Sequence, residues 1–100
     1  MGVIGDSRVY EILKKLSEQN VKPHIIFMVL RLHEDEKLHR GIELVSKGFE
    51  ATDVYNTIEL LVVKGDLTRY GKRTKITDKG RSILKLIGEI IAIAETIVIE

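Results

Sequence analysis

Basic side chains gather in one stretch of this 100-residue chain, where they could bind an anionic partner. Positions 64 to 81 hold seven Lys or Arg residues and two acids, a net charge of +5. Because the whole chain carries only +1, the remainder carries −4. Contact with phosphate groups requires a local concentration of positive charge of this kind. The candidate phosphate-binding side chains within the stretch are Arg69, Lys72, Arg73 and Lys75.

A β-hairpin is expected to carry these four side chains. Two short segments near 67–70 and 73–77 have strand character, and Gly71-Lys72 separates them. Glycine at the first of two turn positions suits a type II′ turn. Leu67 and Ile76 are expected to point into the core, and the basic side chains toward solvent. The alternative is a solvated strand pair whose lysines only discourage edge-to-edge aggregation.

Two helices joined by a short glycine-containing turn precede the hairpin. The spacing of apolar residues predicts one helix over about 38–46 and a second over about 50–63, with Lys47-Gly48 between them. Helix, turn and helix in this order are typical of a helix-turn-helix. The apolar stripe of the first helix is Leu38, Ile42 and Val45. The expected inward residues of the second are Val54, Ile58, Leu61 and Val62, and its expected outward residues are Asp53, Tyr55, Asn56 and Glu59.

Three further helices complete the expected fold. The first lies before residue 20, and Pro23 begins another that reaches about Glu34. The run IIFMVLRL makes this second helix apolar nearly all round, so it should lie at the centre of the fold. The last helix starts at the Thr77 or Asp78 cap and continues to about residue 98.

The last helix has an apolar face too wide for one small domain to cover. Leaving half of that face exposed would create a patch of roughly several hundred Å², which monomers rarely tolerate. We therefore expect a homodimer that forms through this helix, with help from the first one. The expected interface residues are Val9, Leu13, Leu84, Ile87, Ile90, Ile91, Ile93, Ala94, Ile97 and Val98.

The composition narrows the class of protein. The chain has no Cys, which rules out a disulfide framework, a thiol nucleophile and a Cys-ligated zinc. Lys85, Glu89 and Glu95 interrupt the apolar C-terminal run, so no membrane-spanning helix is expected there. The N-terminus lacks the pattern of a signal peptide, which favours a cytoplasmic protein. The many Ile, Lys and Glu residues resemble hyperthermophile usage and suggest an archaeal source.

Other residues that could do chemistry lack the surrounding signature. His24, His33 and His39 lie near the acidic run at 34–36, but without a metal-binding motif they are interpreted as helix-end and surface residues. No serine has a glycine elbow, and no glycine-rich loop could hold a phosphate. The sequence therefore favours a protein that is not an enzyme and that uses no metal and no cofactor.

Two phrases give the chain a family resemblance. The phrase ITDKGRSIL at 76–84 is close to the Leu-Thr-x-x-Gly-Arg-x-Leu-Leu pattern that follows the wing of MarR-type winged-helix transcription regulators. The stretch LLVVKGDLTRY at 60–70 matches the helix end and strand that precede that wing. The chain thus resembles these regulators and their archaeal and archaeal-virus relatives, in detail from about 21 to 87.

The resemblance implies a mainly α fold with a small β-hairpin. It implies one winged helix-turn-helix domain over 1–100, with the helix-turn-helix at about 37–64, the wing at about 66–77 and a C-terminal dimerisation helix at about 78–99. An N-terminal dimerisation helix would flank the other side. Each subunit of the dimer would place helix 50–63 in the major groove and the wing on the flanking backbone or minor groove.

The resemblance also implies roles for single residues. Thr52, Asp53, Tyr55 and Asn56 would face base edges, and Arg69, Lys72 and Arg73 would form the wing contacts. Arg40 and Lys47 could reach phosphates. One departure is that helix 50–63 contains three acids and no base.

The predicted function is therefore a dimeric DNA-binding transcription regulator that reads double-stranded DNA. The acidic helix keeps an alternative open, a winged-helix protein–protein interaction module in a transcription or replication assembly. A pure dimerisation module is a weaker third interpretation. Nothing in the sequence specifies a small-molecule effector.

Overall fold

The computed structural model describes residues 11, 14, 18 and 22–99. Their elements are α2 (Pro23–Leu32), α3 (Ile42–Val45), α4 (Ala51–Lys64), β1 (Leu67–Tyr70), β2 (Arg73–Ile76) and α5 (Asp78–Ile99). The described part is mainly helical with one antiparallel two-stranded sheet, which confirms the predicted fold class at that level. The helix expected before residue 20, with the interface residues Val9 and Leu13, falls almost entirely outside the described residues.

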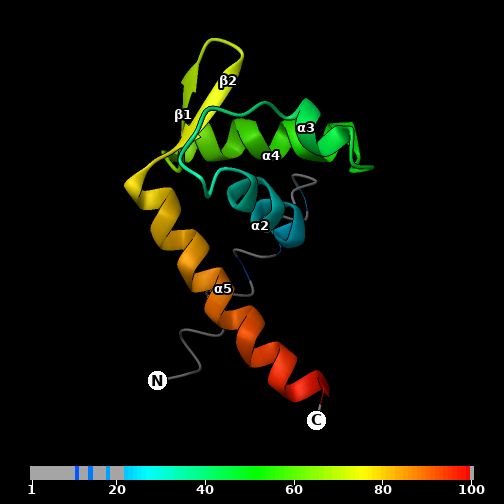
Figure 1. Cartoon of the computed structure of the whole chain (residues 1–100). Helices are drawn as coiled ribbons and strands as arrows, with labels where there is room; N and C mark the ends of the chain where they lie inside the picture. Colours follow the sequence, from blue (N-terminus) through cyan, green and yellow to red (C-terminus); the bar gives the residue numbers. More distant parts are fainter. Residues whose placement is uncertain (1–10, 12–13, 15–17, 19–21, 100) are drawn as a thin grey trace.

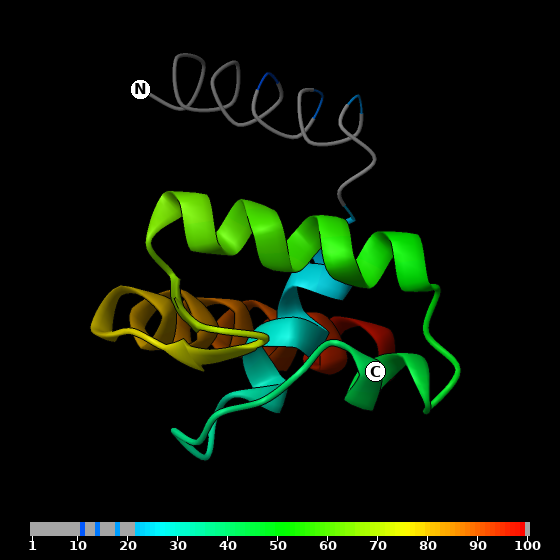
Figure 2. The ribbon, with the colours of Figure 1, turned by 90° about the horizontal axis from the view of Figure 1, so that it is seen from above.

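The helix α2 occupies the centre of the fold, as its apolar run predicted. Figure 2 shows it crossing between α4 and α5, and it contacts both. Pro23 lies in the first turn, where a backbone N–H would have no acceptor within the helix, so proline is tolerated there. Val29 and Leu30 are fully buried. The helix ends at Leu32, short of the predicted Glu34, because the chain turns at residues 33–35.

An aliphatic core joins the helices to the hairpin. It includes side chains from every element of the described part of the chain, and it buries both Leu67 and Ile76 as predicted. The buried members are Ile25, Val29, Leu30, Leu44, Val54, Ile58, Leu61, Leu67, Ile76 and Leu84. Burial of this aliphatic surface is the main contribution to the stability of the fold.

The helix predicted over 38–46 is much shorter in the structure. α3 has only four residues, because His39 is extended and pairs with β2. The His39 N–H donates to the Thr74 carbonyl at 2.9 Å, and the Thr74 N–H donates to the His39 carbonyl at 2.9 Å. Leu38 and Ile42, expected to be inward, are exposed, and Leu44 is the buried residue instead.

The second helix of the pair and the hairpin agree closely with prediction. The Glu50 carboxylate caps α4 by accepting from the Thr52 N–H, and Gly65 ends the helix with a left-handed φ of 87°. The strands pair with Leu67 opposite Ile76 and Tyr70 opposite Arg73, which leaves a two-residue turn. Gly71 has a φ of 63° in that turn, as a type II′ turn requires.

The helix α5 leaves the hairpin and extends away from the other elements (Figure 1). Thr77, expected to lie in the second strand or to cap the helix, takes the capping role: its hydroxyl accepts from the Gly80 N–H at 3.1 Å. Leu84 packs in the core, whereas Leu86, Ile90, Ile93 and Ile97 are exposed. Among the residues that the structure describes, no helix has the length and apolar character needed to cross a membrane.

Candidate nucleic-acid interface

The pairing of the hairpin gives it two different faces. Side chains alternate along a strand, so Arg69 shares the core side with its buried partner Thr74. Thr68, Tyr70, Arg73 and Lys75 lie on the opposite side, and all four are exposed. We call this opposite side the outer face of the hairpin.

Arg69 is exposed as expected, but it lies on the core side of the hairpin and reaches α4. Its guanidinium forms an ion pair with the Glu59 carboxylate, and its side chain is 38% exposed. Because one partner lies on β1 and the other on α4, the pair links the hairpin to the helix. The Arg69 charge therefore offsets an acid of α4.

The basic stretch is thus divided between paired and exposed side chains. Lys79 donates to the carbonyl of Lys64 at 2.7 Å, and Arg81 pairs with Glu36 at 3.1 Å and also with Asp78. The side chains that remain exposed without an ion pair to any described residue include Lys72, Arg73 and Lys75. No acid occurs between Leu67 and Thr77. The charged side chains of the outer face and the turn are therefore all cations.

The exposed side of α4 carries the residues expected to meet base edges. Thr52, Tyr55 and Asn56 are exposed there, as the resemblance implied. The ring of Tyr55 lies against Gly41, where an added Cβ would come within 2.7 Å of its Cε1 atom. The missing side chain at Gly41 therefore makes room for this ring.

Asp53 does not take the outward position that the sequence suggested. Its side chain is only 13% exposed, and Oδ2 accepts from the Lys22 ammonium at 3.0 Å. The structure therefore removes Asp53 from the residues that are free to meet a partner. It also shows that a cation before α2 offsets a second acid of α4.

The two cations expected to reach phosphates from the helix pair are both exposed. Arg40 follows His39, so the β-bridge to Thr74 places its backbone beside the hairpin. Lys47 lies in the turn between α3 and α4, at the opposite end of α4 from the hairpin (Figure 1). The candidate cations thus lie at both ends of α4.

His33 is a buried side chain, which corrects its interpretation as a surface residue. It is 0% exposed, its Nδ1 donates to the Val29 carbonyl at 2.7 Å, and its Nε2 lies 2.8 Å from the Thr74 Oγ1. Burial lowers the pKa of His33, so the neutral ring is favoured and Nε2 accepts from the threonine hydroxyl. The side chain therefore ties the end of α2 to β2.

His39 lies edge-on to His33, with ring centroids 5.3 Å apart, but in a different environment. Its Nδ1 lies 2.9 Å from Glu43 Oε1 and its Nε2 2.8 Å from Asp35 Oδ1. Burial acts to lower the pKa of His39, but the hydrogen bonds to the two carboxylates outweigh it and raise the pKa. No group of His and acidic residues in the described part of the chain is arranged to hold a metal ion.

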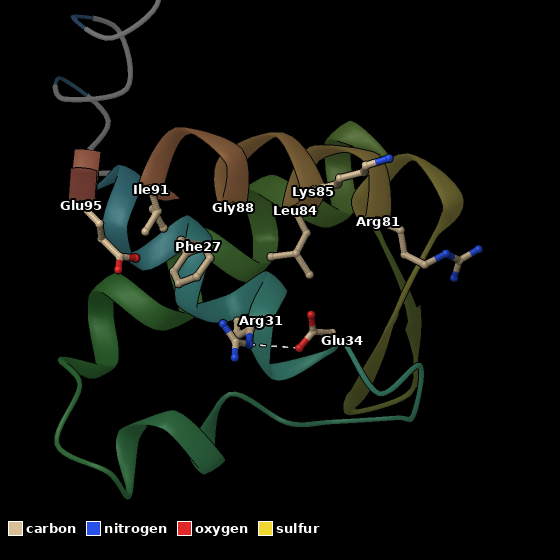
Figure 3. Close-up of a pocket in the computed structure, with 9 residues that line it drawn as sticks. All are labelled: Phe27, Arg31, Glu34, Arg81, Leu84, Lys85, Gly88, Ile91 and Glu95. Atoms are coloured by element: carbon tan, nitrogen blue, oxygen red, sulfur yellow. Dashed lines mark ion pairs between the residues drawn. The ribbon is translucent and has the colours of Figure 1, made fainter. Parts of the chain in front are cut away.

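A cavity of about 490 Å³ lies between α2 and α5 (Figure 3). Phe27, Leu84 and Ile91 point toward one another there, and Arg31 pairs with Glu34 at 3.0 Å on the same side of α2. No local pattern in the sequence indicates this cavity, because one wall comes from residues 27–34 and the other from residues 81–95. Of its charged groups, Arg31 and Glu34 pair with each other, and Arg81 pairs with Glu36 and Asp78 outside the cavity.

Comparison with known proteins returned no match: no protein-family model fits the chain, and no curated protein or solved structure is significantly similar to it.

Proposed function

We propose that this chain is a dimeric winged-helix transcription regulator that binds double-stranded DNA through α4 and the outer face of the hairpin. The observation that carries the proposal is the group of exposed cations on the hairpin, Lys72, Arg73 and Lys75. Phosphate contacts from such side chains supply most of the affinity of non-specific DNA binding. The hairpin would therefore hold the backbone while α4 lies against the duplex.

Contacts between α4 and the hairpin hold these two proposed DNA-binding elements in a fixed arrangement. Glu59 pairs with Arg69 across the two elements, and His39, just before α3, pairs with Thr74 on β2. These contacts fix the angle between the helix pair and the hairpin. A fixed angle favours simultaneous contact with a groove and its flanking backbone, because little ordering is then needed on binding.

The outward residues of α4 have the chemistry of base recognition. The major groove admits one α-helix, where Asn can pair with adenine and Thr with several base edges. Thr52 and Asn56 are exposed on α4, and Tyr55 lies between them in sequence. In this proposal they meet the bases while Arg40 and Lys47 contact the backbone on either side.

The contacts of the three acids of α4 weaken the case that this helix would repel DNA. Glu50 caps the helix, Asp53 pairs with Lys22, and Glu59 pairs with Arg69. The charges of Asp53 and Glu59 are therefore each offset by a cation, and the Glu50 carboxylate serves as the helix cap. The alternative function, a protein–protein interaction module, rested on the acidity of this helix, and these contacts weaken that support.

Dimerisation through α5 is the second part of the proposal. The exposed Leu86, Ile90, Ile93 and Ile97 are spaced by four, three and four positions, which places them on one stripe of the helix. Leu84 is buried in the core of the single chain, and Ile87 and Ile91 are partly buried on that side, so these three are less available than expected. Ile90, Ile93, Ala94 and Ile97 are exposed and remain the proposed contacts, and Leu86 joins them. The side chain of Val98 lies outside the described part of the structure.

Fluorescence anisotropy with a labelled mixed-sequence duplex tests the proposal. The double variant Arg73→Ala/Lys75→Ala should bind at least about tenfold more weakly than the wild type at low salt. Lys85→Ala, a charge loss on α5, is the matched control and should bind as the wild type does. Equal binding by the double variant and the wild type would refute the role of the hairpin. A search for protein partners of α4 would then follow.

A further inference from the structure

The outer face of the hairpin carries an aromatic ring among its cations. Tyr70 is directly opposite Arg73 in the pairing, and Lys75 lies on the same face. Side chains paired across two strands have Cβ atoms about 5 Å apart, so these groups are close neighbours. The Tyr70 side chain is 56% exposed. A partner that approaches the cations must therefore also meet this ring.

The ring has no stacking partner among the described residues. Within that part of the chain the one aromatic contact is between His33 and His39, and no cation–π contact involves Tyr70. Arg73 does not lie over the ring, so the pair is not used to stabilise the hairpin by stacking. More than half of Tyr70 is exposed, so an external group can reach the ring.

Cations beside an exposed aromatic ring favour a ligand that offers both a phosphate and a flat surface for stacking. Cations attract phosphates, and the tyrosine hydroxyl can donate to one, but a phosphate gains nothing from the face of the ring, whereas a nucleobase stacks on it. The bases of an intact duplex are stacked on their neighbours, so they offer no open face along the backbone. An open face exists at an unpaired base, such as one in an overhang or a locally melted site.

We propose that Tyr70 stacks an unpaired nucleobase while Arg73 and Lys75 hold the adjoining phosphates. The contact rests on the proposed DNA binding and extends it, because it gives the protein a preference for duplexes that carry unpaired bases. The hairpin projects beyond the helices in Figure 1, so a strand leaving the duplex could reach its outer face. α4 would meanwhile remain on the paired part.

Three labelled DNAs of one sequence test this contact by anisotropy with the full chain. The first is a blunt duplex, the second carries a short thymidine overhang, and the third carries an overhang of equal length made of abasic units. The last two have the same phosphates and differ only in their bases. We expect the thymidine overhang to bind at least about fivefold tighter than the abasic one, since stacking of a single base supports a difference of this size.

Two variants assign the difference to the ring. Tyr70→Ala should bind the thymidine and abasic overhangs equally well, whatever its affinity for the blunt duplex, and Tyr70→Phe should retain the preference. With 2-aminopurine in the overhang, quenching of its fluorescence on binding should be lost in Tyr70→Ala and kept in Tyr70→Phe. Circular dichroism establishes that both variants fold.

The outcomes separate this inference from the function on which it rests. Blunt-duplex binding with equal affinity for the two overhangs would refute the stacking contact and leave the proposed function standing, even if no variant folded. A preference that survives in Tyr70→Ala would refute the role of the ring. Absence of binding to all three DNAs would refute both proposals.

Discussion

The Nε2 atom of His33 lies 2.8 Å from the Oγ1 atom of Thr74, although 41 positions separate the two residues. Both side chains are almost completely buried. The bond joins the end of the central helix α2 to the second strand of the hairpin, whose outer face carries Arg73 and Lys75. The position of the proposed DNA-binding surface therefore depends on a polar contact inside the fold.

Loss of this bond should destabilise the fold. Thr74→Val keeps the shape of the side chain but leaves the buried Nε2 of His33 without its partner. An unsatisfied buried group of this kind costs about 1–3 kcal/mol in the free energy of unfolding. Thr68→Val, the same change on the exposed outer face, is the matched control and should be nearly neutral. Urea unfolding followed by circular dichroism measures both, and equal stabilities would contradict the role of the bond.

The two histidines should give opposite pH dependences of stability. The folded pKa of His33 is lowered, chiefly by burial, so its contribution is complete above the ordinary value of 6.5 and is lost as the pH falls below it. Burial acts to lower the folded pKa of His39, but the hydrogen bonds to Glu43 and Asp35 outweigh it and raise this pKa. The contribution of His39 to stability is therefore present below pH 6.5 and is lost as the pH rises past the folded pKa. The two contributions partly cancel in the wild type.

Removal of His39 should expose the contribution of His33. In His39→Gln, the free energy of unfolding should fall more steeply than in the wild type on acidification from about pH 7 to pH 5. The burial that lowers the pKa of His33 remains in this variant, and only the smaller effect of the neighbouring charge is lost. The pKa of Asp35 is lowered chiefly by the hydrogen bond from the Lys37 N–H, and that of Glu43 is lowered against burial by the Arg40 N–H together with His39; both backbone donors remain in the variant. Identical pH profiles for the two proteins would count against this account of the histidines.

Two glycines of α5 should respond in opposite ways to alanine. A Cβ on Gly80 would lie 2.2 Å from the backbone carbonyl oxygen of Asp66, so Gly80→Ala must displace the first turn of the helix from the loop before β1. A Cβ on Gly88 meets nothing within 4 Å. Gly88→Ala should therefore stabilise the fold by about 0.5–1 kcal/mol through the helix propensity of alanine. Thermal unfolding of the pair checks this, and destabilisation by Gly88→Ala would contradict the described packing of α5.

A charge on the exposed stripe of α5 should separate the proposed dimer. Ile90 is 64% exposed in the single chain, so Ile90→Asp should leave the fold intact while it opposes burial of this stripe between two copies. Glu89→Lys changes the charge of the adjacent exposed residue and is the matched control. Sedimentation velocity should show a dimer for the wild type and the control, and a monomer for Ile90→Asp. A wild-type monomer, or a dimeric Ile90→Asp protein, would refute this interface.

Local patterns in the sequence predicted the hairpin and its turn, because a two-residue connection that begins with glycine is a short-range signal. The direction of Arg69 was also available from the sequence. Leu67 was expected to point inward, and strict alternation places Arg69 on that same side. Arg69 was grouped with the other bases by charge, although its position in the strand puts it on the other side of the hairpin from Arg73 and Lys75.

The burial of His33 and the shortness of α3 could not be read from local patterns. Both depend on Thr74, which meets the His33 side chain and the His39 backbone only after the chain has folded back on itself. Helical spacing of Leu38, Ile42 and Val45 favoured a longer helix, but the bridge to β2 holds residue 39 extended. Long-range pairing therefore outweighed local periodicity at this point.

The salt dependence of DNA binding tests the central claim most directly. Each phosphate contact contributes about −0.9 to the slope of log K against log salt concentration, so three hairpin cations in each of two subunits contribute about −5 to the slope. Measured by anisotropy from about 50 to 300 mM salt, the slope of Arg73→Ala/Lys75→Ala should be shallower than that of the wild type by about 3 to 4. A steep wild-type slope that flattens in this variant is the predicted result. Absence of binding at low salt, or a slope that the variant leaves unchanged, would contradict the account.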